Sequence, residues 1–396
     1  MKIQINNNTI LHAAFILFFA AEFLFEHTVL SRIALILFFC ASLITLKQLH
    51  KNSFFSSYVA FSAVSLLVIA MGYALDRSVA MGMMQTLFWN ILFLFAFTQY
   101  CGTIGDPLKV LHLYKVLAVM LSAVFVVVGL PSVLRGARLS VWNINSNMIA
   151  MVVAYSVIIH VYEMIKKRKM DLIDLVSLVL LLIVVMMTGS RKGLIIIGIG
   201  IYVLFLLRRP KSIFKYTVVF GAFAFVAWLL MMNVPFLYNA IGYRVEPLIA
   251  YLRGLDYVED SLQTRAHYIE YAWKESQNSP ILGHGIDCFR TLPKAYDSYS
   301  HCNYVELLFS VGWIGTIVYY STSLWTLKKV PKALKRGDSV VPLLISMFVP
   351  FLVCDYMNVT YYTRTMIIIP AIVVMFILNE KKVNSSNGEV KNSAVC

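Results

Sequence analysis

The stretch MMTGSRKGLIIIGIG, from Met186 to Gly200, places two cations in the middle of a long apolar segment. Arg191 and Lys192 stand side by side, and their immediate neighbours are glycines and a serine. The apolar runs on both sides approach the length that crosses a membrane. The stretch therefore predicts a tight hairpin between two transmembrane helices, and it raises the question of what two cations do there.

The same apolar character extends along the whole chain. Of the 396 residues, 60% are hydrophobic and only 14% are charged, and the mean hydropathy is +0.75. A soluble domain is about half apolar and about one quarter charged. Apolar segments of about 20 residues recur along the chain, which is typical of a polytopic helical membrane protein. We therefore expect an all-α fold, and the lack of a secretory cleavage pattern after the first apolar run predicts a retained anchor.

The positive net charge does not indicate nucleic-acid binding. The formal charge is +14, but the lysines and arginines are dispersed over short loops, where they orient a membrane protein. The six cysteines show no metal-ligand spacing. Cys40 and Cys354 lie in apolar spans, as small core residues do. The sequence predicts neither a metal site nor a cofactor.

The hydropathy pattern predicts twelve membrane spans and one large loop. With the N-terminus in the cytoplasm, most of the 34 lysines and arginines fall on the cytoplasmic side, as the positive-inside rule requires. Spans one to nine then occupy residues 1–236, a large outer loop 237–300, spans ten to twelve 301–380 and a cytoplasmic tail 381–396. Long ordered loops are usually functional. The spans are predicted at residues 9–26, 28–46, 57–74, 81–99, 110–130, 146–164, 172–188, 193–207, 217–236, 303–326, 341–357 and 361–379.

In this topology the cationic hairpin lies on the outer face of the membrane. A long side chain near a helix end can snorkel to the interface, and this interpretation suits Lys192. It suits Arg191 less well, because cations are disfavoured in short outer loops. An ionisable group at membrane depth is a candidate for function. From these residues alone, both interpretations of Arg191 stay open.

The large outer loop contains a predicted helix, YVEDSLQTRAHYIEYAWKESQNSP, at residues 257–280. Asp260 or Ser261 can cap it, and Pro280 follows its end. We expect an amphipathic helix that rests on the bundle. Arg265 lies on a stripe beside the apolar face, where it is either solvated or functional. The predicted apolar face consists of Leu262, Ala266, Ile269 and Trp273.

The segment PILGHGIDCFRTLP, at residues 280–293, follows this helix. Gly283 and Gly285 allow a tight turn with exposed backbone amides, which could approach an anion closely. His284, between them, is interpreted as a surface residue of the loop.

The tenth span begins in YSHCNYVELLFSVGWIGTIVYY, at residues 299–320. Gly312 and Gly315 would let this helix pack closely against a neighbour. His301 lies where the loop re-enters the membrane. It is either an interfacial polar anchor or a base, since a neutral imidazole can accept a proton from a hydroxyl group.

Three segments in this order resemble the O-antigen ligase/polymerase superfamily of bacterial envelope enzymes. They are TGSRKGL in the outer hairpin, Arg265 followed by PILGHGIDCF, and SHCNYVELL followed by GWIG. NINSN, at residues 143–147, is similar to an asparagine-containing motif of the family. The resemblance extends from about Arg138 to the end of the tenth span, and spans one to five add only hydropathy.

The resemblance implies a GT-C-like integral membrane glycosyltransferase in the bacterial inner membrane, with both termini in the cytoplasm. Members of the family take a glycan from an undecaprenyl-pyrophosphate donor on the outer face and transfer it to an acceptor sugar. The implied partners are this lipid-linked oligosaccharide, membrane lipid, a chain-length regulator and a flippase. No metal is implied.

The resemblance also assigns roles to individual residues. It places Arg191 and Arg265 on the donor's pyrophosphate and His301 near the acceptor hydroxyl. A guanidinium binds phosphate oxygens in pairs and stays charged, and fixed cations stabilise a leaving group that gains negative charge. Further substrate contacts are expected from Lys192, Gly283, Gly285, Asn303, Tyr304 and Arg138.

One position departs from the family pattern. Many relatives have asparagine directly after the histidine, whereas this chain has Cys302 and keeps Asn303 at the next position. An amide contact from position 302 is therefore in doubt. Cys302 and Cys288 both lie on the oxidising outer side in the predicted topology, and they are either bridged or two unpaired thiols.

Two activities of the family and one activity of another class remain as alternatives. SHCNYVELL followed by GWIGTIVYY resembles polymerases of capsule and O-units more than ligases, which use lipid A core as acceptor. A lipid-linked oligosaccharide flippase or another secondary transporter would also suit twelve spans. Transporters typically show two related halves, and the sequence contains no evident internal repeat. We therefore expect a polymerase, with ligase as the alternative and transporter as the weaker one.

Overall fold

The computed structural model describes residues 7–25, 28–135, 137–142, 144–167, 169, 171–235, 238, 242–252 and 260–378. Within these ranges the chain forms α-helices, two short 3-10 helices and no strand. The 3-10 helices are η1 (Pro210–Ser212) and η3 (Cys288–Thr291). The α-helices are α1 (Asn7–Leu24), α2 (Val29–Ile44), α3 (Ser53–Ala70), α4 (Arg77–Ile104), α5 (Pro107–Leu134), α6 (Ser146–Lys167), α7 (Leu172–Thr188), α8 (Arg191–Arg208), α9 (Ile213–Asn233), α11 (Tyr243–Leu252), α12 (Asp260–Ser276), α13 (Asn303–Lys335), α14 (Val341–Asp355) and α15 (Arg364–Leu378).

Each of the twelve predicted spans coincides with one of these helices, while α11 and α12 lie in the predicted outer loop. Six of the described helices are long and apolar enough to cross a membrane, namely α3, α4, α5, α6, α9 and α13. Five further apolar helices are shorter. The expected all-α polytopic membrane fold is confirmed. The tail predicted at 381–396 and Asn143 of the asparagine motif lie outside the described residues.

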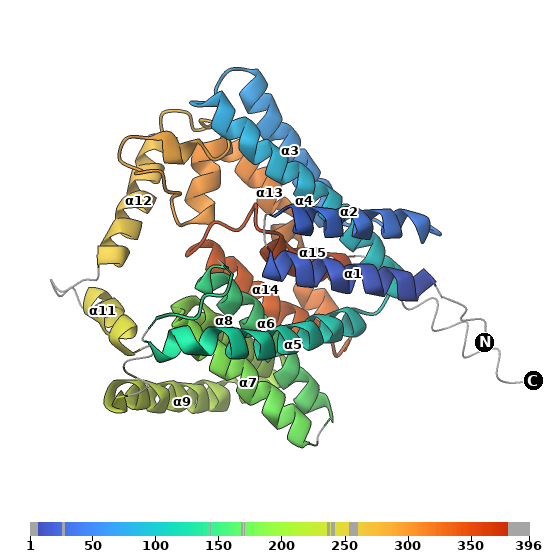
Figure 1. Ribbon diagram of the computed structural model, residues 1–396, viewed down its shortest axis with the longest axis vertical. Coiled ribbons are helices and arrows are strands. Elements are labelled where there is room, and N and C mark those ends of the chain that lie inside the picture. The colour runs from blue at the N-terminus through green and yellow to red at the C-terminus, as the bar shows by residue number, and fades with distance from the viewer. Residues whose placement is uncertain are drawn as a thin grey trace, which may run out of the picture.

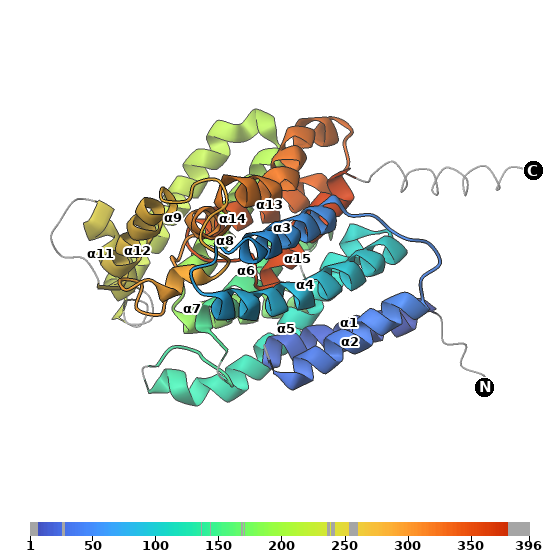
Figure 2. The same cartoon turned by 90° about the horizontal axis from the view of Figure 1, so that it is seen from above.

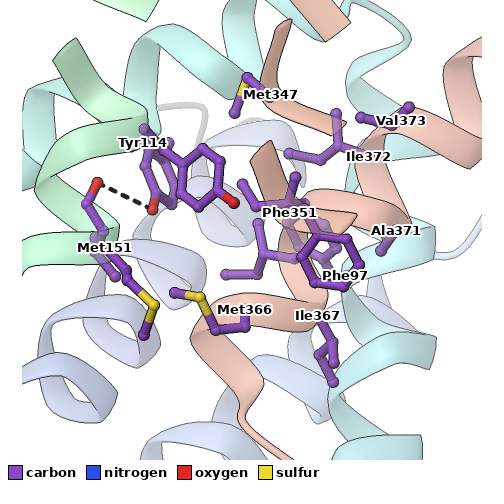
Figure 3. Packing of buried hydrophobic residues seen from close by; sticks show 14 of the residues in the cluster. Phe97, Tyr114, Met151, Met347, Phe351, Met366, Ile367, Ala371, Ile372 and Val373 are labelled. Carbon is purple, nitrogen blue, oxygen red and sulfur yellow. Dashed lines mark hydrogen bonds between the residues drawn. The ribbon is translucent and has the colours of Figure 1, made fainter. Parts of the chain in front are cut away.

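The helices form a bundle with α11 and α12 at one end, opposite the beginning of α1, in both views (Figures 1 and 2). Helix α15 lies inside the bundle, and its residues from Arg364 to Ile377 are buried. Figure 3 shows Met366, Ile367 and Ile372 of α15 among Phe97 of α4 and Phe351 of α14. The core therefore joins the N-terminal helices to the C-terminal ones. Helix α9 lies at the edge, and none of its residues is buried.

An ion pair between described residues of α1 and α15 is buried inside the bundle. Arg364 Nε donates to Glu22 Oε1 at 2.7 Å, and the two side chains are 4% and 2% exposed. Glu22 and Asp174 are acids within apolar spans, and each has a partner in the structure. Asp174 belongs to the capping box of α7 and accepts from Lys167 Nζ at 2.9 Å. Neither acid is left as an unpaired charge within a span, which is the feature that would have favoured a transporter.

Candidate active site

The predicted hairpin between α7 and α8 is confirmed and tight. Helix α7 ends at Thr188, Gly189 takes the left-handed conformation with φ 56°, and α8 begins at Arg191. Gly193 lets α8 approach α6, because a Cβ atom there would lie 3.0 Å from the Cβ of Ala150. Arg191 and Lys192 thus occupy the first turn of α8. A helix N-terminus is positive, so cations there are unfavourable unless an anion joins them.

Arg138 and the asparagine motif hold this hairpin from the side. Arg138 Nε donates to the Thr188 carbonyl at 2.8 Å, and its Nη2 donates to Asn147 Oδ1 at 3.2 Å. Asn147 Oδ1 also accepts from the Ser190 hydroxyl at 2.8 Å. The asparagine motif therefore fixes the cationic turn, a role that the sequence did not indicate. Substrate contact by Arg138 stays a prediction.

Lys192 does not snorkel to the membrane interface, so that interpretation is wrong. Its side chain is 6% exposed, and its Nζ donates to Asn358 Oδ1 at 3.0 Å. Asn358 belongs to the loop between α14 and α15. The lysine turns inward because this loop offers a polar partner, which lies too far along the chain for a local pattern to reveal.

Helix α12 packs on the bundle, but not with the predicted face. Trp273 is 48% exposed, whereas Tyr268 and Ala272 are buried. The buried residues belong to the stripe that also carries Arg265. Arg265 is consequently turned toward the protein and half-buried. A tryptophan directed outward from such a helix suits a position at the membrane surface.

Cations from three separate segments meet at this end of the bundle. Arg265 of α12, Arg138 and Arg191 all interact electrostatically with the ammonium group of Lys192. In the described part of the chain, the Arg265 side chain makes no hydrogen bond or ion pair. Repulsion between like charges is unfavourable, so an anion placed among these cations would reduce their mutual repulsion.

His301 lies beside this cluster, in the turn before α13. It adopts the left-handed conformation with φ 63°, which is uncommon for a residue with a side chain and occurs often at functional sites. Its ring packs at 4.4 Å from Tyr299 and is nearly parallel to Tyr268 at 5.9 Å. Nδ1 is buried and has no hydrogen-bond partner among the described residues.

The environment of His301 keeps its imidazole neutral. Burial lowers the pKa of His301 to about 4, and the charges of Arg265 and Lys192 act in the same direction. A neutral imidazole can accept a proton, whereas an imidazolium cannot. The position thus suits a base better than a cationic anchor.

Glu306 maintains the turn that carries His301. Its Oε2 accepts from the backbone amide of Ser300 at 2.8 Å, and the carboxylate is buried. The Ser300 hydroxyl donates to the Cys302 carbonyl at 3.1 Å. These bonds stabilise a turn that would otherwise be strained at its central residue. In the sequence, Glu306 is visible only as part of the motif SHCNYVELL.

Asn303 and Tyr304 point into the bundle. Asn303 is fully buried, and its Nδ2 donates to the Tyr320 hydroxyl at 2.7 Å. Its Oδ1 accepts from the backbone amides of Thr360 and Tyr361 at 3.0 and 3.1 Å. The Tyr304 hydroxyl donates to the Leu352 carbonyl at 2.7 Å. Their polar groups already have partners within the protein, so we interpret both residues as structural.

The glycine turn is not the exposed amide site that the sequence predicted. The amide of Gly283 donates to the Ser279 carbonyl at 2.9 Å, and that of Gly285 donates to the Ser310 carbonyl at 2.9 Å. His284 is only half-exposed, and its Nε2 lies 3.0 Å from the Glu275 carbonyl. Both glycine amides are used within the fold, so they are not available to an anion.

This turn instead fills a break in α13. Gly312 has non-helical backbone angles, φ 59° and ψ −166°, and a Cβ atom there would lie 2.2 Å from the Ile281 carbonyl oxygen. The Trp313 amide donates across the break to the Pro280 carbonyl at 2.8 Å. Close packing at Gly312 is therefore confirmed. The junction connects α12, the helix that carries Arg265, to the first half of α13, which follows His301.

Cys288 and Cys302 are both buried and free. The structure therefore shows the alternative with two unpaired thiols. Among the described residues, no group of three or more histidines, cysteines or acids is arranged to hold a metal ion.

These features define a multi-pass membrane protein with a cationic site beside a neutral histidine at one end of the bundle. Residues 176–320 match the family model described as O-antigen ligase. The matched range contains Arg191, Arg265 and His301 and confirms the resemblance to the O-antigen ligase/polymerase superfamily over this part of the chain. That family consists of glycosyltransferase-like enzymes. No curated protein matches the chain.

Proposed function

We propose that this protein polymerises undecaprenyl-pyrophosphate-linked oligosaccharide repeat units by glycosyl transfer at the outer face of the bacterial inner membrane. The observation that carries the proposal is the convergence of Arg265, Lys192 and the first turn of α8 beside a neutral His301. A diphosphate is a ligand whose charge suits the cations, and a sugar hydroxyl is a substrate whose proton suits the imidazole.

In the proposed reaction, the arginines bind the donor substrate. Arg191 and Arg265 bind the diphosphate that links glycan to lipid. During transfer, the bond between the anomeric carbon and the diphosphate oxygen breaks, and its electron pair stays on the diphosphate. Fixed cations that face this oxygen stabilise its growing charge, an effect that is worth about 3–4 kcal/mol for one donor group in related electrostatic sites.

The acceptor side belongs to His301. Its neutral imidazole takes the proton of the acceptor hydroxyl while the hydroxyl oxygen forms the new bond to the anomeric carbon. The buried, unpartnered Nδ1 leaves the other ring nitrogen, Nε2, as the candidate base. The rings of Tyr299 and Tyr268 hold the imidazole plane in place.

Ligation to lipid A core is the second candidate, and the observation that favours it is the matched family model, which is described as O-antigen ligase. Both activities use the same donor chemistry and differ in the acceptor. Polymerase and ligase activity would therefore be distinguished by the residues that contact the acceptor.

Deletion of the gene, followed by analysis of the glycans, distinguishes the candidates. Loss of a polymerase leaves single repeat units attached to the core. Loss of a ligase leaves bare core, with polymer retained on its lipid carrier. Loss of a flippase stops lipid-linked units from reaching the outer face. We expect single repeat units, restored to polymer by the wild-type gene, and either of the other two patterns would contradict the proposal.

A further inference from the structure

The partner of Lys192 is unusual for a buried cation. Burial of a charge is costly, and buried cations are normally paired with a carboxylate. Lys192 is 6% exposed, yet its ammonium group donates to the neutral amide oxygen of Asn358 at 3.0 Å. In the part of the chain that the structure describes, Lys192 forms no salt bridge. The amide positions the ammonium group and leaves its charge uncompensated.

The same asparagine also contacts the histidine side of the site. The backbone carbonyl of Asn358 accepts from the Asn303 amide at 3.2 Å, and Asn303 follows His301 by two positions. The loop between α14 and α15 thus connects the first turn of α8 with the turn before α13. Asn358 therefore contacts Lys192 through its side chain, and through its backbone carbonyl it contacts Asn303, next to the turn that carries His301.

We propose that Asn358 is a positioning residue, which presents the Lys192 ammonium group to the donor's diphosphate as a third cation and keeps it unneutralised. The inference rests on the proposed function, because it takes the diphosphate as the missing counter-ion. It adds Asn358 to the site and assigns the charge of Lys192 to the donor. The site then selects a diphosphate over a monophosphate, since three cations match the larger charge.

Two substitutions of Asn358 separate this role from simple packing. Aspartate has nearly the shape of asparagine but would form an ion pair with Lys192. Alanine removes the contact and leaves the charge. If Asn358 merely packs, Asn358→Asp should be milder than Asn358→Ala. If Asn358 keeps the cation uncompensated, the order is reversed. Neither change removes the backbone carbonyl that accepts from Asn303.

The measurement is the affinity of the full-length purified protein for undecaprenyl pyrophosphate, with undecaprenyl monophosphate as the comparison ligand. We expect Asn358→Asp to weaken binding of the diphosphate at least tenfold, and Asn358→Ala to weaken it about threefold, while thermal stability of the aspartate variant is retained. Lys192→Gln should match Asn358→Asp, because each lowers the net charge of the site by one. Asn278→Asp is the matched control: Asn278 is exposed in the segment that follows α12, not in the loop that carries Asn358, and its change should leave affinity unchanged.

Binding by Asn358→Asp that equals wild type, or exceeds that of Asn358→Ala, overturns the inference. If Arg265→Ala loses binding while Asn358→Asp keeps it, the inference fails and the proposed function stands. If wild-type protein binds neither lipid, both fail. Equal affinity for diphosphate and monophosphate in the wild type also overturns the charge argument.

Discussion

Arg364 and Lys192 are both buried cations near the interior of one helix bundle, but only Arg364 faces a carboxylate. Arg364 is paired with Glu22 at 2.7 Å, and both side chains are almost fully enclosed. Lys192 is almost as enclosed, and it faces the amide of Asn358. Arg265, which interacts electrostatically with Lys192, has no partner of its own among the described residues.

The difference separates a charge that is paired within the fold from one that we propose faces a ligand. The Glu22–Arg364 pair joins α1 to α15, and each charge has its counter-ion within the protein. The cluster around Lys192 contains several cations and stands at a helix N-terminus, where positive charge is least favourable. In the proposed function, the diphosphate of the donor supplies the negative charge that this cluster faces. We therefore expect changes at the Glu22–Arg364 pair to alter folding stability. Changes at the cluster around Lys192 should alter donor binding and glycosyl transfer.

The largest effect is expected from Glu22→Ala. The change leaves the Arg364 guanidinium buried without a counter-ion, which costs about 3–5 kcal/mol of folding stability. Thermal unfolding in detergent should show a clear loss of stability, whereas the folded fraction should bind undecaprenyl pyrophosphate as wild type does. Loss of binding with unchanged stability would place this pair in the substrate site and break the comparison.

The next largest effect is expected from Arg191→Lys and Arg265→Ala. Each removes a guanidinium that, in the proposed function, binds the diphosphate, so transfer should fall by about 10²–10³-fold with little change in thermal stability. Lysine should fail nearly as badly as alanine at position 191, because a point charge does not reproduce a bidentate fork. The measurement is turnover of lipid-linked donor by purified protein. Lys274→Ala, an exposed change on the same helix as Arg265, is the control. Normal turnover in the Arg191→Lys variant would refute the assignment.

A smaller effect is expected in the pH profile. His301 acts as a base only when neutral, and its pKa is lowered to about 4. For the free enzyme, kcat/KM should therefore stay constant from pH 8 down to about pH 5.5. Bound diphosphate adds negative charge near the imidazole and raises its pKa, so kcat should fall at a higher pH than kcat/KM. A fall in kcat/KM centred near pH 6.5 would indicate a solvated histidine and contradict the burial described for His301.

The smallest effect concerns Cys288 and Cys302, which contribute no charge to either region. Both are free thiols in the structure. Thiol labelling of denatured, non-reduced protein should therefore modify all six cysteines. Labelling of only four would reveal a bridge. Cys302→Asn, which introduces the residue that many relatives carry, should leave transfer within about twofold of wild type because position 302 forms no charged contact.

The helices could be predicted from the sequence because membrane-length apolar segments are strong local signals. Loops that hold helix ends together were harder to predict, because their partners lie far along the chain. The glycine turn at Gly283 and Gly285 illustrates this point. Two glycines suggested open amides, but the amide of Gly285 donates to Ser310, in a break of another helix. No local pattern contains that information.

Within the site, the residues that carry charge could be predicted and those that position them could not. Arg191, Arg265 and His301 were indicated by the order of motifs around them, and the structure brings this region together. Asn358 lies in a short loop with no motif of its own, and its importance appears only when Lys192 is seen to reach it. The outward direction of Trp273 was also missed, because periodicity identifies two stripes on α12 without saying which one the bundle covers.

The central claim is that cations serve the donor and His301 serves the acceptor. It is tested most directly by measuring how undecaprenyl pyrophosphate binds to the Arg265→Ala and His301→Ala variants of the purified protein. Both variants should lose transfer. We expect Arg265→Ala to lose donor affinity at least tenfold, whereas His301→Ala should keep donor affinity within about twofold of wild type. Donor binding that collapses in His301→Ala, or that survives intact in Arg265→Ala, would contradict this division of the site.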